Sequence, residues 1–191
     1  GPNGAGKSTL LACLSGLLEP EAGLVTLAGT PLARTSLRAR AQAIGYLPQT
    51  PEIAWDVSVE TLVSLGRIPW PGAGGSEAIE AALAAMDLAA LRRRPVSRLS
   101  GGERARALMA RVLAGEPRWL LADEPLANLD LAHAATLVAR FRARAAMGAG
   151  VVLVLHDLAQ AMNHADRVLV LREGKLIADG PPCKALSEAV I

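Results

Sequence analysis

The first nine residues constrain most strongly what this chain can fold into. They read Gly-Pro-Asn-Gly-Ala-Gly-Lys-Ser-Thr, which matches the pattern G-x-x-x-x-G-K-S of a phosphate-binding loop. Glycines let the backbone wrap so that successive N–H groups point at a polyphosphate, while Lys7 would contact the β- and γ-phosphates and Ser8 would ligate Mg²⁺. Apolar residues at helical spacing follow, so a helix N-terminus would also face the phosphates. The alternative is a glycine-rich turn before an ordinary helix.

No strand pattern precedes this loop, although a phosphate-binding loop normally follows directly on a strand. The chain also lacks an initiator methionine. We therefore expect an N-terminally truncated fragment in which the first strands of the sheet are missing.

The composition narrows the class of protein. With 191 residues, of which 51% are apolar, the chain can form one α/β domain with a subdomain inserted in it. It has no run of 18 or more apolar residues, so no membrane-spanning helix is expected. The net charge of +2 is too small to indicate nucleic acid as a partner, and we expect none. Cys13 and Cys183 do not have the spacing of a metal-binding motif.

Strand and helix patterns alternate along much of the chain. The strand patterns lie at 24–28, 43–47, 119–122 and 151–155, and a hairpin is expected from 167–172 and 175–178. The helix patterns lie at 34–41, 57–65, 77–86, 99–114 and 130–147. Alternating strands and helices imply a parallel sheet with right-handed crossovers.

The stretch between the second and third strand patterns carries helices and no convincing strand. We interpret it as an inserted α-helical subdomain at 50–115, between two parts of a nucleotide-binding core at 1–49 and 116–191. The predicted fold class is α/β, a P-loop nucleoside triphosphatase with a mostly parallel central sheet.

Two apolar strand patterns are followed by residues whose side chains can bind a metal ion or transfer a proton. Asp123 and Glu124 follow one such strand, and His156 follows the next. Because ligands bind at the carboxyl ends of parallel strands, these side chains and Lys7 are expected around one hollow. Asp123 would hold Mg²⁺, Glu124 would polarise the attacking water, and His156 would contact the γ-phosphate or orient Glu124. The alternatives are a helix cap for the acidic pair and a structural role for His156.

A second anion-binding site is indicated at the start of a later helix. Ser100, Gly101 and Gly102 stand where backbone N–H groups can bind an anion. Two phosphate sites in one chain suggest that one of them serves a neighbouring molecule. The alternative is a helix cap in which Glu103 completes a capping box with Ser100, and both interpretations can hold together.

Several further residues have less specific interpretations. Four apolar side chains around the first helix of the subdomain form either its core or a groove for a partner, namely Ile53, Trp55, Ile68 and Trp70. Arg92, Arg93 and Arg94 are interpreted as a solvated helix end. His133 and His164 lie in helix patterns and are given no role.

Together, these motifs resemble the nucleotide-binding subunit of ATP-binding cassette (ABC) transporters, in the family's order and over nearly the whole chain. The motifs are the phosphate loop at 1–8, Gln49 after Leu47-Pro48, Leu-Ser-Gly-Gly-Glu at 99–103, Leu-Leu-Ala-Asp-Glu-Pro at 120–125, Asn-Leu-Asp at 128–130, and His156. Further segments at 46–49, 55–59 and 66–69 are similar to importers of iron-siderophore, haem and vitamin B12 type.

The resemblance implies a dimer of two ATPase subunits that face each other head-to-tail around two ATP molecules. Ser100, Gly101, Gly102 and Asp130 would then act in trans, on the opposite ATP or subunit. ATP and Mg²⁺ are the implied cofactors, with Ser8, Gln49 and Asp123 as metal ligands. The implied ATP contacts are Asn3, Gly4, Ala5, Gly6, Lys7, Ser8, Thr9, Gln49 and His156, and the implied catalytic residues are Lys7, Glu124 and His156.

The resemblance also implies a peripheral location on the cytoplasmic face of the cell membrane. A permease would dock beside the helical subdomain, and an extracytoplasmic substrate-binding protein would act indirectly. The implied function is ATP hydrolysis that drives import of a metal chelate. The alternatives are an ATPase of another importer or an exporter, or a soluble regulator without a permease. The chain departs from the family in having Glu103 where Gln is commoner, and it lacks the upstream aromatic residue that stacks on adenine.

Overall fold

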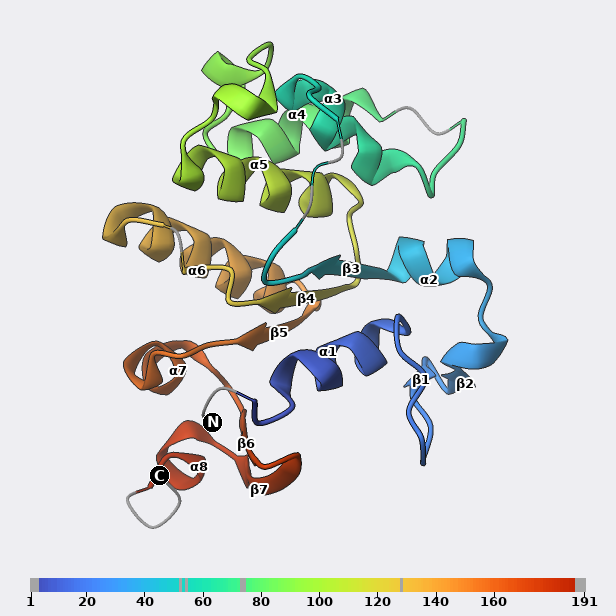
Figure 1. Ribbon diagram of the computed structural model, residues 1–191, viewed down its shortest axis with the longest axis vertical. Coiled ribbons are helices and arrows are strands. Elements are labelled where there is room, and N and C mark those ends of the chain that lie inside the picture. The colour runs from blue at the N-terminus through green and yellow to red at the C-terminus, as the bar shows by residue number, and fades with distance from the viewer. Residues whose placement is uncertain (1–3, 52, 54, 73–74, 128, 188–191) are drawn as a thin grey trace.

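The computed structural model describes residues 4–51, 53, 55–72, 75–127 and 129–187. A three-stranded parallel sheet runs through its middle (Figure 1). In spatial order its strands are β3 (Ile44–Leu47), β4 (Trp119–Asp123) and β5 (Gly150–Val154). The expected α/β fold with a parallel central sheet is confirmed.

The two faces of strand β4 explain how the sheet is covered. Successive side chains of a strand point to opposite faces. Leu121 packs with Leu11 of α1 (Lys7–Ser15) on one face, whereas Leu120 and Ala122 belong to the main hydrophobic core on the other. All of these strand residues are buried, as is usual where helices cover both faces of a parallel sheet. Helix α1 therefore packs on the sheet with its first turn at the phosphate loop.

Three helices form a layer over the opposite face of the sheet (Figure 1). They are α3 (Val59–Ser64), α4 (Ser76–Ala85) and α5 (Gly101–Ala114), with the 3-10 turns η2 (Leu65–Arg67), η3 (Ala89–Leu91) and η4 (Val96–Arg98) between them. Helix α3 begins at a cap, since the Ser58 hydroxyl accepts a hydrogen bond from the Thr61 backbone N–H. The apolar sides of this layer share one core with Phe141 of α6 (Leu131–Ala146). The division of the chain at residues 49 and 115 stays a prediction.

Arg92 links two helices of this layer. Its guanidinium group binds Glu60 of α3 at 2.5 Å and Glu80 of α4 at 2.6 Å. The hydrogen bond from Arg92 holds the pKa of the Glu60 carboxyl below its usual range. Arg94 in turn lies 3.4 Å from the Glu103 carboxylate. The three arginines follow the 3-10 turn η3, as expected for a helix end, and Arg93 and Arg94 are exposed; the ion pairs of Arg92 and Arg94 were not expected.

The segment after α3 packs closely on the end of α5. A Cβ atom at Gly66 would lie 2.0 Å from the carbonyl oxygen of Arg111, so no larger residue fits at this position without a backbone shift. Arg67 and Trp70 donate hydrogen bonds to two further carbonyl oxygens at this helix end, at 3.0 and 3.1 Å. Carbonyl groups that a helix leaves without partners at its C-terminus are thereby satisfied.

The same segment is joined to α2 (Leu37–Ala43), which packs beside β3. The carbonyl oxygen of Pro69 accepts two hydrogen bonds, one from Arg38 Nε at 3.1 Å and one from Gln42 Nε2 at 2.7 Å. This oxygen atom thus adds a polar contact between the helical layer and α2 to the apolar packing of the layer on the sheet.

The first strand pattern forms a hairpin and not a single strand. β1 (Thr26–Leu27) and β2 (Thr30–Pro31) pair antiparallel across Ala28 and Gly29, both of which have positive φ. Positive φ at both central residues is the requirement of a type I′ turn. The strand expected at 24–28 is therefore shorter, and the chain reverses after it into a second strand that was not expected. A 3-10 turn η1 (Leu32–Arg34) follows, and α2 begins only after its cap Ser36.

The C-terminal part contains α7 (Leu158–His164), β6 (Val168–Arg172), β7 (Lys175–Gly180) and α8 (Pro182–Ala185). The expected hairpin is present, because β6 pairs antiparallel with β7 across Glu173 and Gly174. Within the described ranges, no helix is both long enough and apolar enough to cross a membrane.

Candidate nucleotide-binding site

The phosphate loop has the backbone conformation that its glycines predict. Gly4 and Gly6 have φ values of 76° and 92°, in the left-handed region that favours glycine. Gly6 precedes the first turn of α1, so the N-terminal N–H groups of this helix face the loop. Lys7 begins the helix, and Ser8 and Thr9 are exposed in its first turn. Asn3, like Gly1 and Pro2, lies outside the described residues.

The turn between β6 and β7 contacts the phosphate loop through the backbone. The backbone N–H of Gly174 donates to the carbonyl oxygen of Ala5 at 3.2 Å, and Ala5 is buried. A Cβ atom at Gly6 would lie 3.6 Å from the Cα atom of Gly174. Sequence reasoning located this turn but missed its contact with the loop, because no local pattern links residues so far apart.

Asp123 is placed where a metal ion could bind. It is the last residue of β4, its exposed fraction is 3%, and within the described structure its Oδ1 atom has no hydrogen-bond partner. A buried carboxylate oxygen without a partner is costly, and a cation would satisfy it. Gln49 is exposed just beyond the carboxyl end of β3, at the same edge of the sheet. One carboxylate with a hydroxyl and an amide oxygen suits Mg²⁺, which also takes phosphate oxygens and waters as ligands.

The Asp123 carboxylate in turn affects a residue of the neighbouring strand β3. Tyr46 of β3 lies beside Leu121 of β4, two residues before Asp123. Burial and the negative charge of Asp123 raise the pKa of the Tyr46 hydroxyl. The hydroxyl therefore stays neutral next to the carboxylate over the physiological pH range.

Glu124 and His156 meet at the carboxyl ends of β4 and β5. His156 Nε2 lies 2.6 Å from Glu124 Oε1, and the Glu124 backbone N–H donates to the Val154 carbonyl oxygen at 3.1 Å. Glu124 has a φ of 52°, in the left-handed region that few residues with a side chain adopt. The alternative of a helix cap for the acidic pair is wrong, because the cap of α6 is Asp130.

Lys7 and His156 line one cavity of about 970 Å³. Asp123, Glu124 and His156 lie at the carboxyl ends of the neighbouring strands β4 and β5. The structure therefore brings these three side chains to one edge of the sheet, and Lys7 shares a cavity with His156. Their catalytic and metal-binding roles stay predictions.

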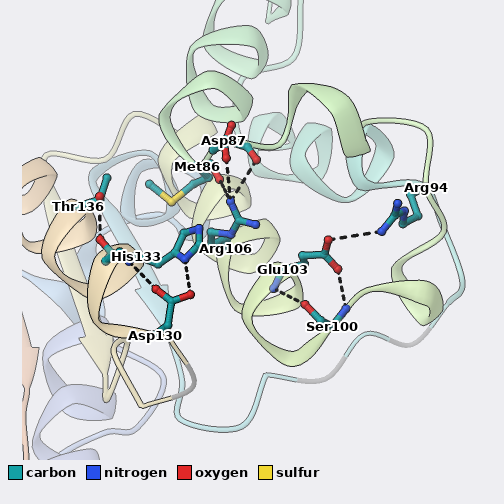
Figure 2. A network of polar contacts seen from close by, with 10 residues as sticks. Met86, Asp87, Arg94, Ser100, Glu103, Arg106, Asp130, His133 and Thr136 are labelled. Carbon is teal, nitrogen blue, oxygen red and sulfur yellow. Dashed lines mark hydrogen bonds and ion pairs between the residues drawn. The ribbon is translucent and has the colours of Figure 1, made fainter.

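The second candidate anion site has the geometry of a capping box. The Ser100 hydroxyl accepts from the Glu103 backbone N–H at 3.2 Å, and the Glu103 carboxylate accepts from the Ser100 backbone N–H at 2.7 Å (Figure 2). The hydrogen bonds from Ser100, together with the nearby charge of Arg94, lower the pKa of the Glu103 carboxyl. The serine hydroxyl accepts in this bond, so its own hydrogen can still be donated to an anion. Gly101 and Gly102 form the first turn of α5, on the other face of the sheet from α1.

The Asp130 side chain caps α6 and also contacts the ring of His133. Its Oδ1 atom accepts from the His133 backbone N–H at 2.9 Å, and its Oδ2 atom lies 2.7 Å from His133 Nδ1 (Figure 2). These bonds from His133 lower the pKa of the Asp130 carboxyl. Asn128, which belongs to the same motif, lies outside the described residues.

The four apolar residues of the helical region have different environments, and Trp70 is the one that is partly buried with a hydrogen bond to the Gly115 carbonyl oxygen. Ile53 packs against the main core, whereas Trp55 and Ile68 are 73% and 71% exposed. Ile68 also lines a cleft of about 350 Å³ that Tyr46 lines from the sheet side. The core interpretation is therefore wrong for Trp55 and Ile68.

Known proteins are similar to this chain in sequence and in fold. The family model described as ABC transporter matches residues 1–127. Hemin import ATP-binding protein HmuV of Rhodococcus jostii (strain RHA1) is 44% identical over 195 residues, which cover 100% of this chain and 67% of that relative. This chain thus spans about two thirds of that relative's length.

Two solved structures illustrate the similarity in fold. One is the structure of cbiO1 from Clostridium perfringens, part of the ABC transporter complex cbiONQ, with a TM-score of 0.81 and 28% sequence identity. The match covers 100% of this chain and 78% of the cbiO1 chain. The other is a bacterial Atm1-family ABC exporter with ATP bound, with a TM-score of 0.84 and 26% sequence identity. The match covers 97% of this chain and 33% of the exporter chain.

Proposed function

Since the chain belongs to the ABC transporter family, as its motifs indicated, we propose that it is the subunit that binds and hydrolyses ATP to power import of a metal chelate through a permease. Haem is the cargo that we expect, because the relative from Rhodococcus jostii is named a hemin import protein and is similar along this whole chain. The cytoplasmic face of the membrane is the location that this function requires.

The observation that carries the proposed hydrolysis is the contact between Glu124 and His156, beside the phosphate loop. A carboxylate at this edge can accept the proton of a water that attacks the γ-phosphate. His156, 2.6 Å away, holds the Glu124 carboxylate in one orientation. Lys7 places a positive charge on the phosphates, and Ser8, Gln49 and the buried Asp123 would hold Mg²⁺. When bound, Mg²⁺ supplies charge neutralisation at the phosphate oxygens.

The proposed assembly contains two copies of the subunit, arranged head-to-tail. Ser100, Gly101 and Gly102 start a helix that lies across the sheet from α1, which supports two anion sites that belong to two different nucleotides. Asp130 contacts the opposite subunit in this arrangement. The exposed side chains of Trp55 and Ile68 are our candidates for contact with the permease. An extracytoplasmic binding protein delivers the cargo to that permease.

The test of hydrolysis is the substitution Glu124→Gln in the full-length protein. The amide keeps the size and hydrogen-bonding capacity of the side chain but cannot accept the proton from water. We expect ATP binding to be retained and hydrolysis to fall by roughly 100-fold or more. Glu77→Gln, at an exposed position in the first turn of α4, is the matched control and should leave hydrolysis unchanged. Hydrolysis at the wild-type rate in Glu124→Gln would overturn the assigned role.

The test of transport uses vesicles that contain the permease and the full-length ATPase. Haem uptake that needs both ATP and the binding protein supports import. ATP-driven transport in the outward direction without a binding protein would indicate an exporter subunit. Failure of the ATPase to associate with any membrane protein would indicate the soluble regulator.

A further inference from the structure

We propose that His133 is a positioning residue, which holds the Asp130 carboxylate in the orientation needed to contact the opposite subunit. This inference rests on the head-to-tail dimer proposed above. His133 lies in the first turn of α6, a helix of 16 residues, and Asp130 is the cap of that helix.

The contact engages both oxygen atoms of the carboxylate. Oδ1 accepts from the His133 backbone N–H at 2.9 Å, which is the ordinary bond of a helix cap. Oδ2 lies 2.7 Å from Nδ1 of the His133 ring, and no helix cap requires this second bond. One residue therefore fixes both the position and the plane of the Asp130 carboxylate.

A second capping aspartate in the same chain, Asp157, has a cap that backbone N–H groups make without a side-chain donor. Asp157 caps α7, and its Oδ1 atom accepts from the backbone N–H groups of Ala159 and Gln160 at 2.8 and 3.4 Å. Both of these bonds end on one oxygen and come from the backbone. The ring contact at Asp130 is thus an addition to the cap and is not needed to begin a helix.

The ring can hold the carboxylate in either of its protonation states. Neutral histidine with its hydrogen on Nδ1 donates to Oδ2, and protonated histidine donates from the same atom. Figure 2 shows that the ring faces α5, where Arg106 is engaged with the carbonyl oxygens of Met86 and Asp87 at 3.0 and 3.1 Å. Arg106 also lies 3.5 Å from the Asp87 carboxylate.

A fixed carboxylate favours assembly for an entropic reason. The side chain of Asp130 is 65% exposed, so without the ring only the cap bond to Oδ1 would hold it, and Oδ2 would be ordered only when the second subunit binds. Side chains that become immobilised at an interface reduce the affinity, and a side chain that is already ordered does not. His133 therefore makes the ATP-bound dimer easier to form.

The experiment compares His133→Asn with His133→Gln in the full-length protein. The amide of Asn lies close to the place of Nδ1 and can still donate to Oδ2, whereas the longer Gln carries its amide near the place of Nε2. Gln is the better helix former of the two, so a role in helix stability alone would favour Gln. A positioning role favours Asn.

Two measurements distinguish these outcomes. The first is the ATP concentration at half-maximal hydrolysis, with kcat determined separately. The second is ATP-induced dimer formation by size exclusion in a Glu124→Gln background, where hydrolysis is suppressed. We expect His133→Gln to shift both midpoints upward by roughly 2- to 10-fold, and His133→Asn to remain within about 2-fold of the wild type.

Two results would overturn the inference, and they can be told apart. If the dimer forms and Asp130→Ala weakens it, but His133→Gln behaves like the wild type or better than His133→Asn, His133 has no positioning role. If ATP induces no dimer even when His133 is intact, the head-to-tail assembly itself fails, and this inference fails with it.

Discussion

The imidazole of His156 and the carboxylate of Glu124 lie 2.6 Å apart, although 32 positions separate them in the chain. Each residue follows the end of its own strand, and the two strands are neighbours in the parallel sheet. The hydrogen bond therefore depends on the register of β4 with β5. Any change that shifts this register would separate the two side chains.

This contact gives a prediction for His156. His156→Ala removes the partner that orients Glu124, so we expect hydrolysis to fall by at least about tenfold. His156→Gln carries an amide near the place of Nε2 and should retain more activity than the alanine variant. Steady-state hydrolysis and nucleotide binding measured in parallel check this. His164→Gln, on α7, is the control, and equal activity of the Ala and Gln variants at position 156 would contradict the orienting role.

Trp55 gives a prediction for association with the permease. Its large exposed ring is typical of a residue that becomes buried at an interface. Trp55→Ser should reduce co-purification of the full-length ATPase with its membrane partner by roughly tenfold or more. Leu24→Ser is the matched control, because Leu24 is 70% exposed and lies outside the helical region. An equal loss of association in both variants would show that Trp55 has no special contribution.

Gly66 gives a prediction for stability. Its added Cβ atom would lie 2.0 Å from a backbone oxygen of α5, which cannot move without distorting the helix. Gly66→Ala should lower the free energy of unfolding by about 2–3 kcal/mol, in the upper part of the range for overpacking. Urea unfolding measures this change. Gly180→Ala has no atom within 4 Å of the added Cβ and should change stability far less.

Glu103 gives a prediction for the effect of pH on stability. Its carboxyl pKa is lowered in the folded chain, chiefly by the hydrogen bonds from Ser100. The charged form therefore stabilises the fold above the ordinary glutamate pKa of about 4.3, and this contribution disappears as the pH falls through the lowered value. Glu103→Gln should have a lower Tm than the wild type at pH 7. The two Tm values should converge in acid, and a difference that is constant from pH 7 to pH 3 would contradict the assignment.

Part of the site could be predicted because it depends on local patterns. Asp123 and His156 each follow an apolar strand, and parallel strands bring such ends to one edge. The phosphate loop could be predicted for the same reason, since glycine at Gly4 and Gly6 is required by the conformation of a few consecutive residues. The hairpin turn at Glu173 and Gly174 was likewise readable from the sequence.

Other contacts depend on how distant elements pack, and the sequence does not reveal them. Arg92 forms ion pairs with Glu60 and Glu80, which lie 32 and 12 residues away in the sequence, because α3 and α4 lie side by side. The contact of Gly174 with Ala5 arises in the same way. His133 is different, since its spacing of three residues from Asp130 at a helix start was visible in the sequence. The geometry of a helix cap could have identified that pair.

The carbonyl oxygen of Pro69, which accepts hydrogen bonds from Arg38 and Gln42 of α2, has a mechanical consequence. If the three helices swivelled against the sheet, both donors would lose the same acceptor in one movement. These two bonds would therefore be lost or formed together, in addition to the apolar packing that also joins this layer to the sheet.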